Sequence, residues 1–191
     1  IAVIGAGTMG QGIAQVCALA GYSIKLYDIQ ADITRIALAA IRKSLDASVV
    51  KNKISSGQKD EALSRIQVVG DFRLLQVDMA IEAVVEKVEV KHMILSELEK
   101  INGMDCLMVS NTSSFPITQL ASVLKHKDRF AGLHFFNPAP AMKLVEIIRG
   151  AATTDHTIEV LDSFVGSLSK SAVQAADSPG FIVNRVARPF Y

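Results

Sequence analysis

Cysteine is scarce in this chain. Only Cys17 and Cys106 occur among its 191 residues, and neither belongs to the paired spacing that marks a zinc site. Both thiols lie in apolar surroundings, which argues against the disulfide framework of a small secreted domain. We therefore expect a reduced, intracellular protein, cytoplasmic in location, with no metal site.

An excess of charge of one sign is missing as well. The formal net charge is +1, and the sequence contains no basic stripe and no block of like charges, which argues against nucleic acid as a partner. No apolar run is long enough to cross a bilayer, and the chain opens on a strand-like run instead of the basic start of a signal peptide. We expect no membrane partner either.

What the sequence does contain is a regular alternation of strand and helix patterns. Half of the residues are hydrophobic and a fifth are charged, as in a folded globular domain of ordinary size. Apolar runs predict strands at IAVIG, SIKLYD, QVVGD, MAIEAVV, CLMVSN, RFAGLHFF, KLVEII and SAVQAA. Helical patterns cover residues 9–21, 31–51, 58–66, 87–100, 116–124 and 154–169, and a further helix starts within 180–191. Strands that are apolar throughout and alternate with helices imply a parallel sheet covered on both faces.

The turn after the first strand reads VIGAGTMG, which places three glycines in G-x-G-x-x-G spacing. Gly5 permits a tight turn, Gly7 lets the backbone approach a pyrophosphate, and Gly10 lets the helix pack close to the sheet. Free N–H groups at the helix start, where Thr8 and Met9 stand, attract phosphates. The pattern predicts an α/β fold: a Rossmann-type doubly wound, mostly parallel sheet, with a helical insertion after the second strand.

An acidic residue supports the dinucleotide interpretation. Asp28 ends the second strand about 20 residues beyond the glycines, where a carboxylate can bind both ribose hydroxyls. No arginine stands beside it, so a 2′-phosphate would meet an unpaired negative charge. The site therefore favours NAD over NADP. The alternative interpretation is a structural turn followed by a surface aspartate.

Two strand-like runs, GLHFF and KLVEII, each contain one ionisable residue, His134 and Glu146. On spacing alone, ordinary polar positions at strand ends explain them best. The catalytic interpretation makes His134 the base for a hydroxyl proton while a hydride leaves to a nicotinamide. Glu146 would then fix the tautomer and stabilise the imidazolium. The connecting loop NPAPAMK could place the two side chains together.

A cluster of hydroxyl residues follows the fifth predicted strand. Residues 110–114, SNTSS, lie at the carboxyl end of that strand, where open α/β sheets bind their ligands. Serine and threonine also cap helices, and a helix follows directly. Both roles stay open for this cluster.

The segments GAGTMGQGIAQ, SNTSS, RFAGLHFFNPAPAMKLVEII and DSPGFIVNR together resemble the NAD-dependent L-3-hydroxyacyl-CoA dehydrogenases, over essentially the whole chain. The resemblance implies His134 as catalytic base and Glu146 as its orienting carboxylate. It implies that Ser113 and Asn184 hold the reacting oxygen and that Asn137 lies near the nicotinamide.

The same resemblance implies NAD contacts for Glu86 and Lys91, and coenzyme A contacts for Ser44 and Lys51 on the helical insertion. Plain structural interpretations exist for each transferred residue. Lys51 and Lys91 could be solvated surface lysines, Ser44 an exposed helix serine, Glu86 a polar strand end, Asn137 a turn residue and Asn184 a helix cap.

Members of that family carry a C-terminal helical domain that completes the acyl-CoA cleft and forms the dimer interface. We expect an NAD-binding domain over residues 1–179 and the truncated start of the helical domain over residues 180–191. The chain alone should bind NAD but turn over poorly, and the whole protein should be a homodimer.

Substrate choice within the family stays open. The segments look most like bacterial members, including those that oxidise 3-hydroxyadipyl-CoA in the breakdown of aromatic acids such as phenylacetate. Enzymes for 3-hydroxybutyryl-CoA, the β-oxidation enzymes of fatty acid metabolism and a module of a multifunctional polypeptide compete with them. Two other classes also stay open: a hydroxyacid-type NAD dehydrogenase, which needs a carboxylate-binding arginine, and a non-catalytic NAD sensor, which needs no His–Glu pair.

Overall fold

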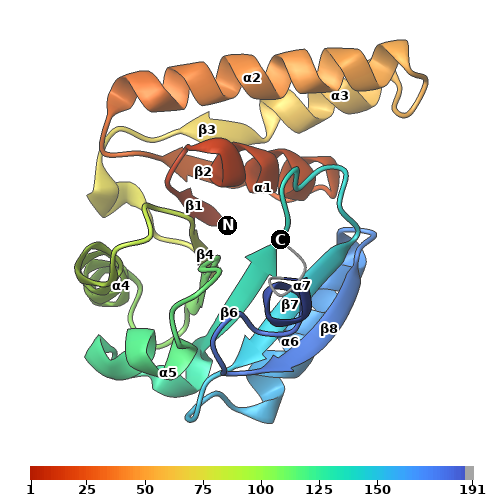
Figure 1. Cartoon of the computed structure of the whole chain (residues 1–191). Helices are drawn as coiled ribbons and strands as arrows, with labels where there is room; N and C mark the ends of the chain where they lie inside the picture. The colour runs from red at the N-terminus through yellow and green to blue at the C-terminus, as the bar shows by residue number, and fades with distance from the viewer. Residues whose placement is uncertain (188–191) are drawn as a thin grey trace.

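The computed structural model describes residues 1–187, so the last part of the predicted final helix, 188–191, lies outside the described residues. The described strands form one eight-stranded sheet in the order β3-β2-β1-β4-β5-β6-β7-β8 (Figure 1). Their bounds are β1 (Ala2–Ile4), β2 (Ile24–Tyr27), β3 (Ile66–Val68), β4 (Met79–Glu82), β5 (Leu107–Ser110), β6 (Phe130–Phe135), β7 (Leu144–Arg149) and β8 (Ser171–Ala176). The predicted α/β, doubly wound, mostly parallel fold is confirmed.

The prediction did not give the direction of each strand: β7 runs antiparallel to β6, while every other neighbouring pair is parallel. The segment between them, 136–143, contains no helix. Parallel neighbours need a crossover of about a dozen residues or more, so this short loop can only return the chain in the opposite direction. β8 is again parallel to β7, since α6 (Asp155–Ser167) supplies that crossover.

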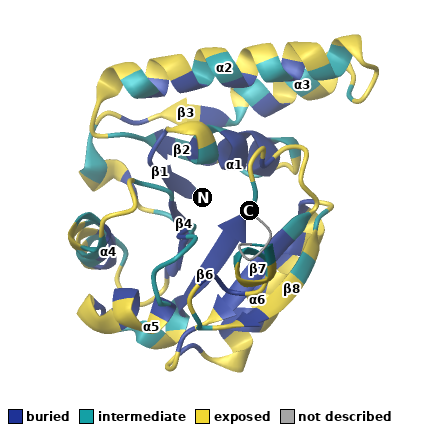
Figure 2. Ribbon diagram, in the orientation of Figure 1, coloured by how far each residue is buried: buried dark blue, intermediate teal, exposed yellow. Residues whose placement is uncertain are grey.

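Helices cover both faces of the sheet. α1 (Thr8–Leu19), α2 (Ala31–Val50), α3 (Ser56–Ser64) and α6 pack on one face, and α4 (Val88–Asn102) and α5 (Ile117–Leu120) pack on the other. Each face of the sheet therefore has its own hydrophobic core. In β1, Val3 belongs to the core under α1, while Ala2 and Ile4 belong to the core under α4, so the central strands are buried on both sides (Figure 2). The remaining elements are α7 (Val183–Ala187) and three 3-10 turns, η1 (Phe72–Leu74), η2 (Ala121–Val123) and η3 (Lys127–Arg129). Among the described residues, no helix is long and apolar enough to cross a membrane.

The predicted helical insertion after the second strand is present as α2 and α3, which lie together beyond β3 in Figure 1. α3 starts earlier than the predicted residue 58 because Ser55 begins a capping box. Its hydroxyl accepts the Gln58 N–H at 3.1 Å, and the Gln58 side chain accepts the Ser55 N–H at 2.8 Å. Such reciprocal capping fixes the first turn of a helix.

The glycine-rich turn between β1 and α1 is closely packed. Gly5 has a φ of 97°, a conformation that strongly favours glycine. A Cβ atom at Gly10 would lie only 1.7 Å from the Gly5 carbonyl oxygen, whereas a Cβ atom at Gly7 would meet nothing within 4 Å. The predicted packing role of Gly10 is therefore confirmed: α1 can approach the turn only without a side chain there.

Gly10→Ala should destabilise the fold, because the added methyl group would collide with backbone and force α1 away from the sheet. We expect a loss of about 1–3 kcal/mol or more, and so a melting temperature lower by several degrees. Thermal unfolding followed by circular dichroism measures this. Gly7→Ala is the matched control and should cost no more than about 1 kcal/mol. Equal melting temperatures for the Gly10→Ala variant and the wild type would contradict the packing argument.

Candidate active site

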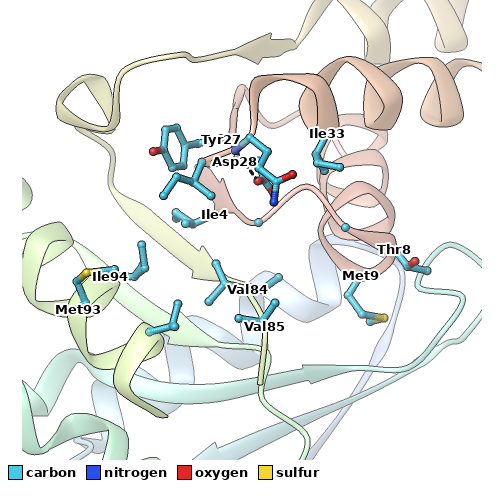
Figure 3. Close-up of a pocket in the computed structure, with 16 residues that line it drawn as sticks. Ile4, Thr8, Met9, Tyr27, Asp28, Ile33, Val84, Val85, Met93 and Ile94 are labelled. Carbon is cyan, nitrogen blue, oxygen red and sulfur yellow. Dashed lines mark hydrogen bonds between the residues drawn. The ribbon is translucent and has the colours of Figure 1, made fainter. Parts of the chain in front are cut away.

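The glycine-rich turn forms one side of a pocket of about 450 Å³ at the carboxyl ends of β1, β2 and β4 (Figure 3). Gly5, Gly7, Thr8, Met9 and Asp28 all line it. The rest of its wall is mainly apolar and is formed by Ile4, Tyr27, Ile29, Gln30, Ile33, Ala83, Val84, Val85, Val90, Met93 and Ile94. A glycine turn, one carboxylate and an apolar wall match the phosphate, ribose and adenine parts of a dinucleotide.

Asp28 is held in place by the backbone on both sides of the pocket. Its Oδ2 accepts the Ala6 N–H at 2.8 Å, and its Oδ1 accepts the Gln30 N–H at 3.0 Å. Each carboxylate oxygen keeps a further lone pair for a hydroxyl donor. The carboxylate is therefore fixed in orientation and can still receive two ribose hydroxyls.

A second pocket of about 290 Å³ adjoins the first, and both are lined by Met9, Ala83 and Val84. Five of the predicted site residues meet in this second pocket: Met9, Glu86, Ser113, His134 and Asn137. A dinucleotide with its adenine in the first pocket would extend its nicotinamide end towards the second.

His134 and Glu146 are directly opposite each other on β6 and β7. His134 Nδ1 lies 2.7 Å from Glu146 Oε2, and the Glu146 side chain is fully buried. The predicted contact is confirmed. The other oxygen, Glu146 Oε1, accepts the N–H groups of Ile182 and Val183, both at 2.9 Å. The ring of His134 also packs between two aromatic rings, those of Phe136 and Phe181. With Nδ1 occupied by the carboxylate, Nε2 is the nitrogen left to exchange a proton.

The hydroxyl cluster after β5 does not cap α5. The first N–H groups of α5, those of Ile117 and Thr118, are bonded by Asp177 at 2.6 and 2.8 Å, so the capping interpretation of this cluster is wrong. Glu86 Oε1 instead accepts the Thr112 hydroxyl, the Ser113 N–H at 3.1 Å and the Ser114 hydroxyl at 2.9 Å. The loop is therefore fixed with Ser113 on the wall of the second pocket.

Asn184 lies beside Ser113 and is not an ordinary helix cap. Its Nδ2 is 3.5 Å from the Ser113 carbonyl oxygen, which joins the start of α7 to the loop after β5. Asn184 is not among the residues that line the second pocket.

The surface-lysine interpretation of Lys91 is wrong. Its side chain is 1% exposed, and its Nζ lies 2.7 Å from Glu82 Oε1 and 3.1 Å from Glu86 Oε2. The ammonium group stands behind Glu86 and lines neither pocket.

The two residues predicted to contact coenzyme A are separated. Ser44 lines a groove of about 190 Å³ between α1, α2 and the loop that carries Asn137 and Pro138. Lys51 lies beyond the end of α2, is exposed, and lines neither this groove nor the two pockets.

Glu82 was not predicted from the sequence, and Asn111 and Ser110 were predicted only as members of the cluster 110–114. Asn111 lines the second pocket and accepts the Phe135 N–H at 2.8 Å, which ties the end of β6 to β5. Glu82 is a fully buried carboxylate at the end of β4, and Ser110 donates to it at 2.5 Å. A sequence signal did exist for Glu82, because the run MAIEAVV places one carboxylate inside an apolar strand, as KLVEII does for Glu146.

Comparison with known proteins gives consistent relationships. Residues 1–178 match the family described as "3-hydroxyacyl-CoA dehydrogenase, NAD binding domain". The chain is 43% identical over 192 residues to 3-hydroxyadipyl-CoA dehydrogenase of Escherichia coli K12, which covers all of this chain and 40% of that protein. It is 44% identical over 190 residues to 3-hydroxybutyryl-CoA dehydrogenase of Bradyrhizobium diazoefficiens, covering 99% of this chain and 65% of that protein.

A solved structure agrees with these relatives. The crystal structure of (S)-3-hydroxybutyryl-CoA dehydrogenase from Ralstonia eutropha superposes with a TM-score of 0.96 at 40% identity, over 99% of this chain and 67% of that one. The chain thus spans between two fifths and two thirds of the length of the two relatives named above. The family match establishes that this domain takes NAD as its cofactor.

Gly7→Ala should weaken NAD binding without unfolding the domain. The added methyl group would project into the open space beside the glycine turn, where the pyrophosphate needs close approach to the backbone. We expect the dissociation constant for NAD to rise about tenfold or more, which is about 1.4 kcal/mol. Isothermal titration calorimetry measures it, with adenosine as the control ligand, since adenosine lacks the pyrophosphate. Unchanged NAD affinity would place the pyrophosphate elsewhere.

Proposed function

The chain belongs to the 3-hydroxyacyl-CoA dehydrogenase family, and we propose that the protein it forms oxidises L-3-hydroxyacyl-CoA to 3-oxoacyl-CoA with NAD. The observation that carries the proposal is the bonded pair of His134 and Glu146 in the pocket that adjoins the glycine-turn pocket. The pair supports the proposal because oxidation of an alcohol needs a proton acceptor beside the nicotinamide end of the cofactor.

The described residues fit NAD in three respects. The backbone at Gly7 is open to a pyrophosphate, the Asp28 carboxylate at the pocket is held by two backbone N–H groups, and the two pockets share lining residues. NAD supplies the acceptor for the hydride that leaves carbon 3 of the substrate. The protein must do the rest, which is to hold the alcohol and accept its proton.

His134 is the proposed general base, acting through Nε2. As the alcohol proton arrives, the ring becomes positively charged, and the Glu146 carboxylate 2.7 Å from Nδ1 stabilises that charge. The N–H groups of Ile182 and Val183 keep the carboxylate aligned with the ring. General base catalysis of this kind contributes about 10²–10⁴-fold to the rate.

Ser113 and Asn184 are the proposed hydrogen-bond partners of the reacting oxygen, and Asn184 would polarise the carbonyl in the reverse direction. Their support is positional, because Ser113 lines the second pocket and Asn184 bonds to its backbone. Asn137, on the same pocket wall, is proposed to lie near the nicotinamide. Glu86 is the proposed NAD contact in this region, and Lys91 would act through Glu86.

The coenzyme A part of the substrate is proposed to follow the groove that starts at Asn137 and passes Ser44. Lys51 would meet it only at its far end, beyond α2. Relatives named for 3-hydroxyadipyl-CoA and 3-hydroxybutyryl-CoA are of nearly equal identity, so both substrates belong in the assay.

A hydroxyacid-type dehydrogenase on the same fold is less well supported. Among the described residues, no arginine lines either pocket, and Arg149 is engaged 2.7 Å from Asp155 at the other end of β7. A substrate carboxylate beside the reacting carbon would lack its usual bidentate partner.

The function is tested with the full-length protein and a panel of L-3-hydroxyacyl-CoA esters of increasing chain length, including one with a terminal carboxylate, by following NADH formation. His134→Gln should lower turnover by about 10²–10⁴-fold while the dissociation constant for NAD stays the same, because the variant loses only the base. No NADH from any ester with the wild type would refute the function. Equal turnover in the variant would remove His134 from the mechanism.

We further propose that residues 1–179 form the NAD-binding domain and that residues 180–191 begin a C-terminal helical domain, which also makes a homodimer. Support comes from the family match over residues 1–178 and from the part of each relative that this chain does not cover. In the whole protein, that helical domain would complete the acyl-CoA cleft. Cytoplasmic location is proposed with the same function.

Residues 1–191 alone should bind NAD with an affinity close to that of the full-length protein, since the glycine turn and Asp28 lie within them. The same chain should oxidise 3-hydroxyacyl-CoA at least about 10²-fold more slowly, because substrate positioning is incomplete. Calorimetry and the NADH assay, run on both proteins, measure the two effects. Robust turnover by residues 1–191 would contradict the domain proposal.

A further inference from the structure

Five residues at the wall of the second pocket and behind it form a closed ring of hydrogen bonds and ion pairs. Lys91 Nζ contacts Glu82 at 2.7 Å and Glu86 at 3.1 Å. Ser110 Oγ donates to Glu82 at 2.5 Å and accepts the Thr112 N–H at 3.2 Å. The Thr112 hydroxyl donates to Glu86, which closes the ring. These five residues, called here the acidic ring, join the loop after β4 to the loop after β5.

The acidic ring carries one unbalanced negative charge. It contains two carboxylates, Glu82 and Glu86, and one ammonium group, Lys91, so one negative charge remains after pairing. Burial alone would raise the pKa of the Glu86 carboxyl, but the Thr112 hydrogen bond and the Lys91 charge outweigh it and hold the pKa below the usual range. Glu86 is therefore ionised at neutral pH.

The unbalanced charge faces the second pocket. Glu86 lines that pocket together with His134 and Asn137, whereas Glu82 and Lys91 are buried behind it, 0% and 1% exposed. A charge next to the buried, low-dielectric interior of the protein is screened less than a charge surrounded by solvent. The other carboxylate near the pocket, Glu146, is bonded to His134 and two backbone N–H groups.

We propose that the acidic ring makes the site select the oxidised form of its cofactor, NAD⁺, over NADH. The nicotinamide ring of NAD⁺ carries a positive charge and that of NADH is neutral, while the rest of the two molecules is the same. A fixed negative charge beside the ring therefore lowers the free energy of bound NAD⁺ and leaves bound NADH almost unchanged. The inference rests on the proposed function, because it needs the nicotinamide in the second pocket.

Two substitutions remove the surplus charge from different places in the ring. Glu86→Gln removes it at the pocket wall, and Glu82→Gln removes it from a fully buried position that cannot touch a ligand. Both variants should lower the ratio of the NADH to the NAD⁺ dissociation constant, by about three- to tenfold for one charge a few ångströms from the nicotinamide. Calorimetry on the full-length protein measures both constants.

Matched controls separate charge from folding and from general cofactor binding. Glu99→Gln also removes a buried carboxylate, one that bonds the backbone of Lys125 and His126, outside both pockets, and should leave the ratio unchanged. ADP-ribose lacks the nicotinamide, so its affinity should be the same in all variants. If Glu82→Gln does not fold, the wild type can be tested directly with a neutral benzamide isostere of NAD⁺. The wild-type protein should bind this isostere about three- to tenfold more weakly than NAD⁺.

The outcomes are distinguishable. A wild-type protein that binds neither dinucleotide would refute the proposed function. Tight binding of both, with the same ratio in both glutamate variants, would refute the inference alone. If the ratio of the two dissociation constants changes in Glu86→Gln but not in Glu82→Gln, the effect comes from a local contact of Glu86, and the ring does not act as an electrostatic unit. Equal affinity of the wild type for NAD⁺ and for its neutral isostere would also refute the inference.

Discussion

A carboxylate buried inside a β-sheet must be matched by charge or by hydrogen-bond donors, and the second pocket is organised around two such groups. Glu146 on β7 and Glu82 on β4 are both fully buried. Removing an ionised carboxylate from water costs several kcal/mol unless partners replace the solvent. Glu146 finds its partners on β6 and at the start of α7, and Glu82 finds them on α4, β5 and its own loop. Segments far apart in the sequence are thereby drawn to one edge of the sheet.

The antiparallel pairing of β6 and β7 places His134 directly opposite Glu146. Residues directly opposite each other on antiparallel strands share a face and lie within side-chain reach. His134 opposes Glu146 in this way, so the short loop 136–143 fixes both the strand direction and the dyad. That loop also carries Asn137 to the wall of the same pocket. One hairpin thus positions the proposed base, its carboxylate and a residue for the cofactor end.

The sequence predicted the features that depend on local pattern. The glycine turn, Asp28 and the alternating elements follow from spacing and residue type. The direction of β7 was not predicted, although the sequence shows no helix between the two runs. The surroundings of Lys91 and of the hydroxyl cluster were not predicted for a different reason. Their partners, Glu82 and Glu86, are set by packing between α4 and the loop after β5, which no local pattern encodes.

Buried carboxylates of this kind can be recognised in the sequence before a structure is known. In an amphipathic strand a glutamate can occupy a solvent-facing position, where its carboxylate is hydrated and needs no protein partner. In MAIEAVV and KLVEII the residues on either side of the glutamate are apolar, so both faces of the strand are expected to be buried and the carboxylate has no route to water. It must then meet a cation, a histidine or several N–H groups inside the protein, and such clusters are concentrated at functional sites. Both glutamates stand near the carboxyl edge of the sheet in the described structure, one behind a histidine and one behind a second carboxylate. A single acidic residue in an otherwise apolar run, in a chain of doubly wound pattern, is therefore stronger evidence for the location of a site than the glycine turn alone.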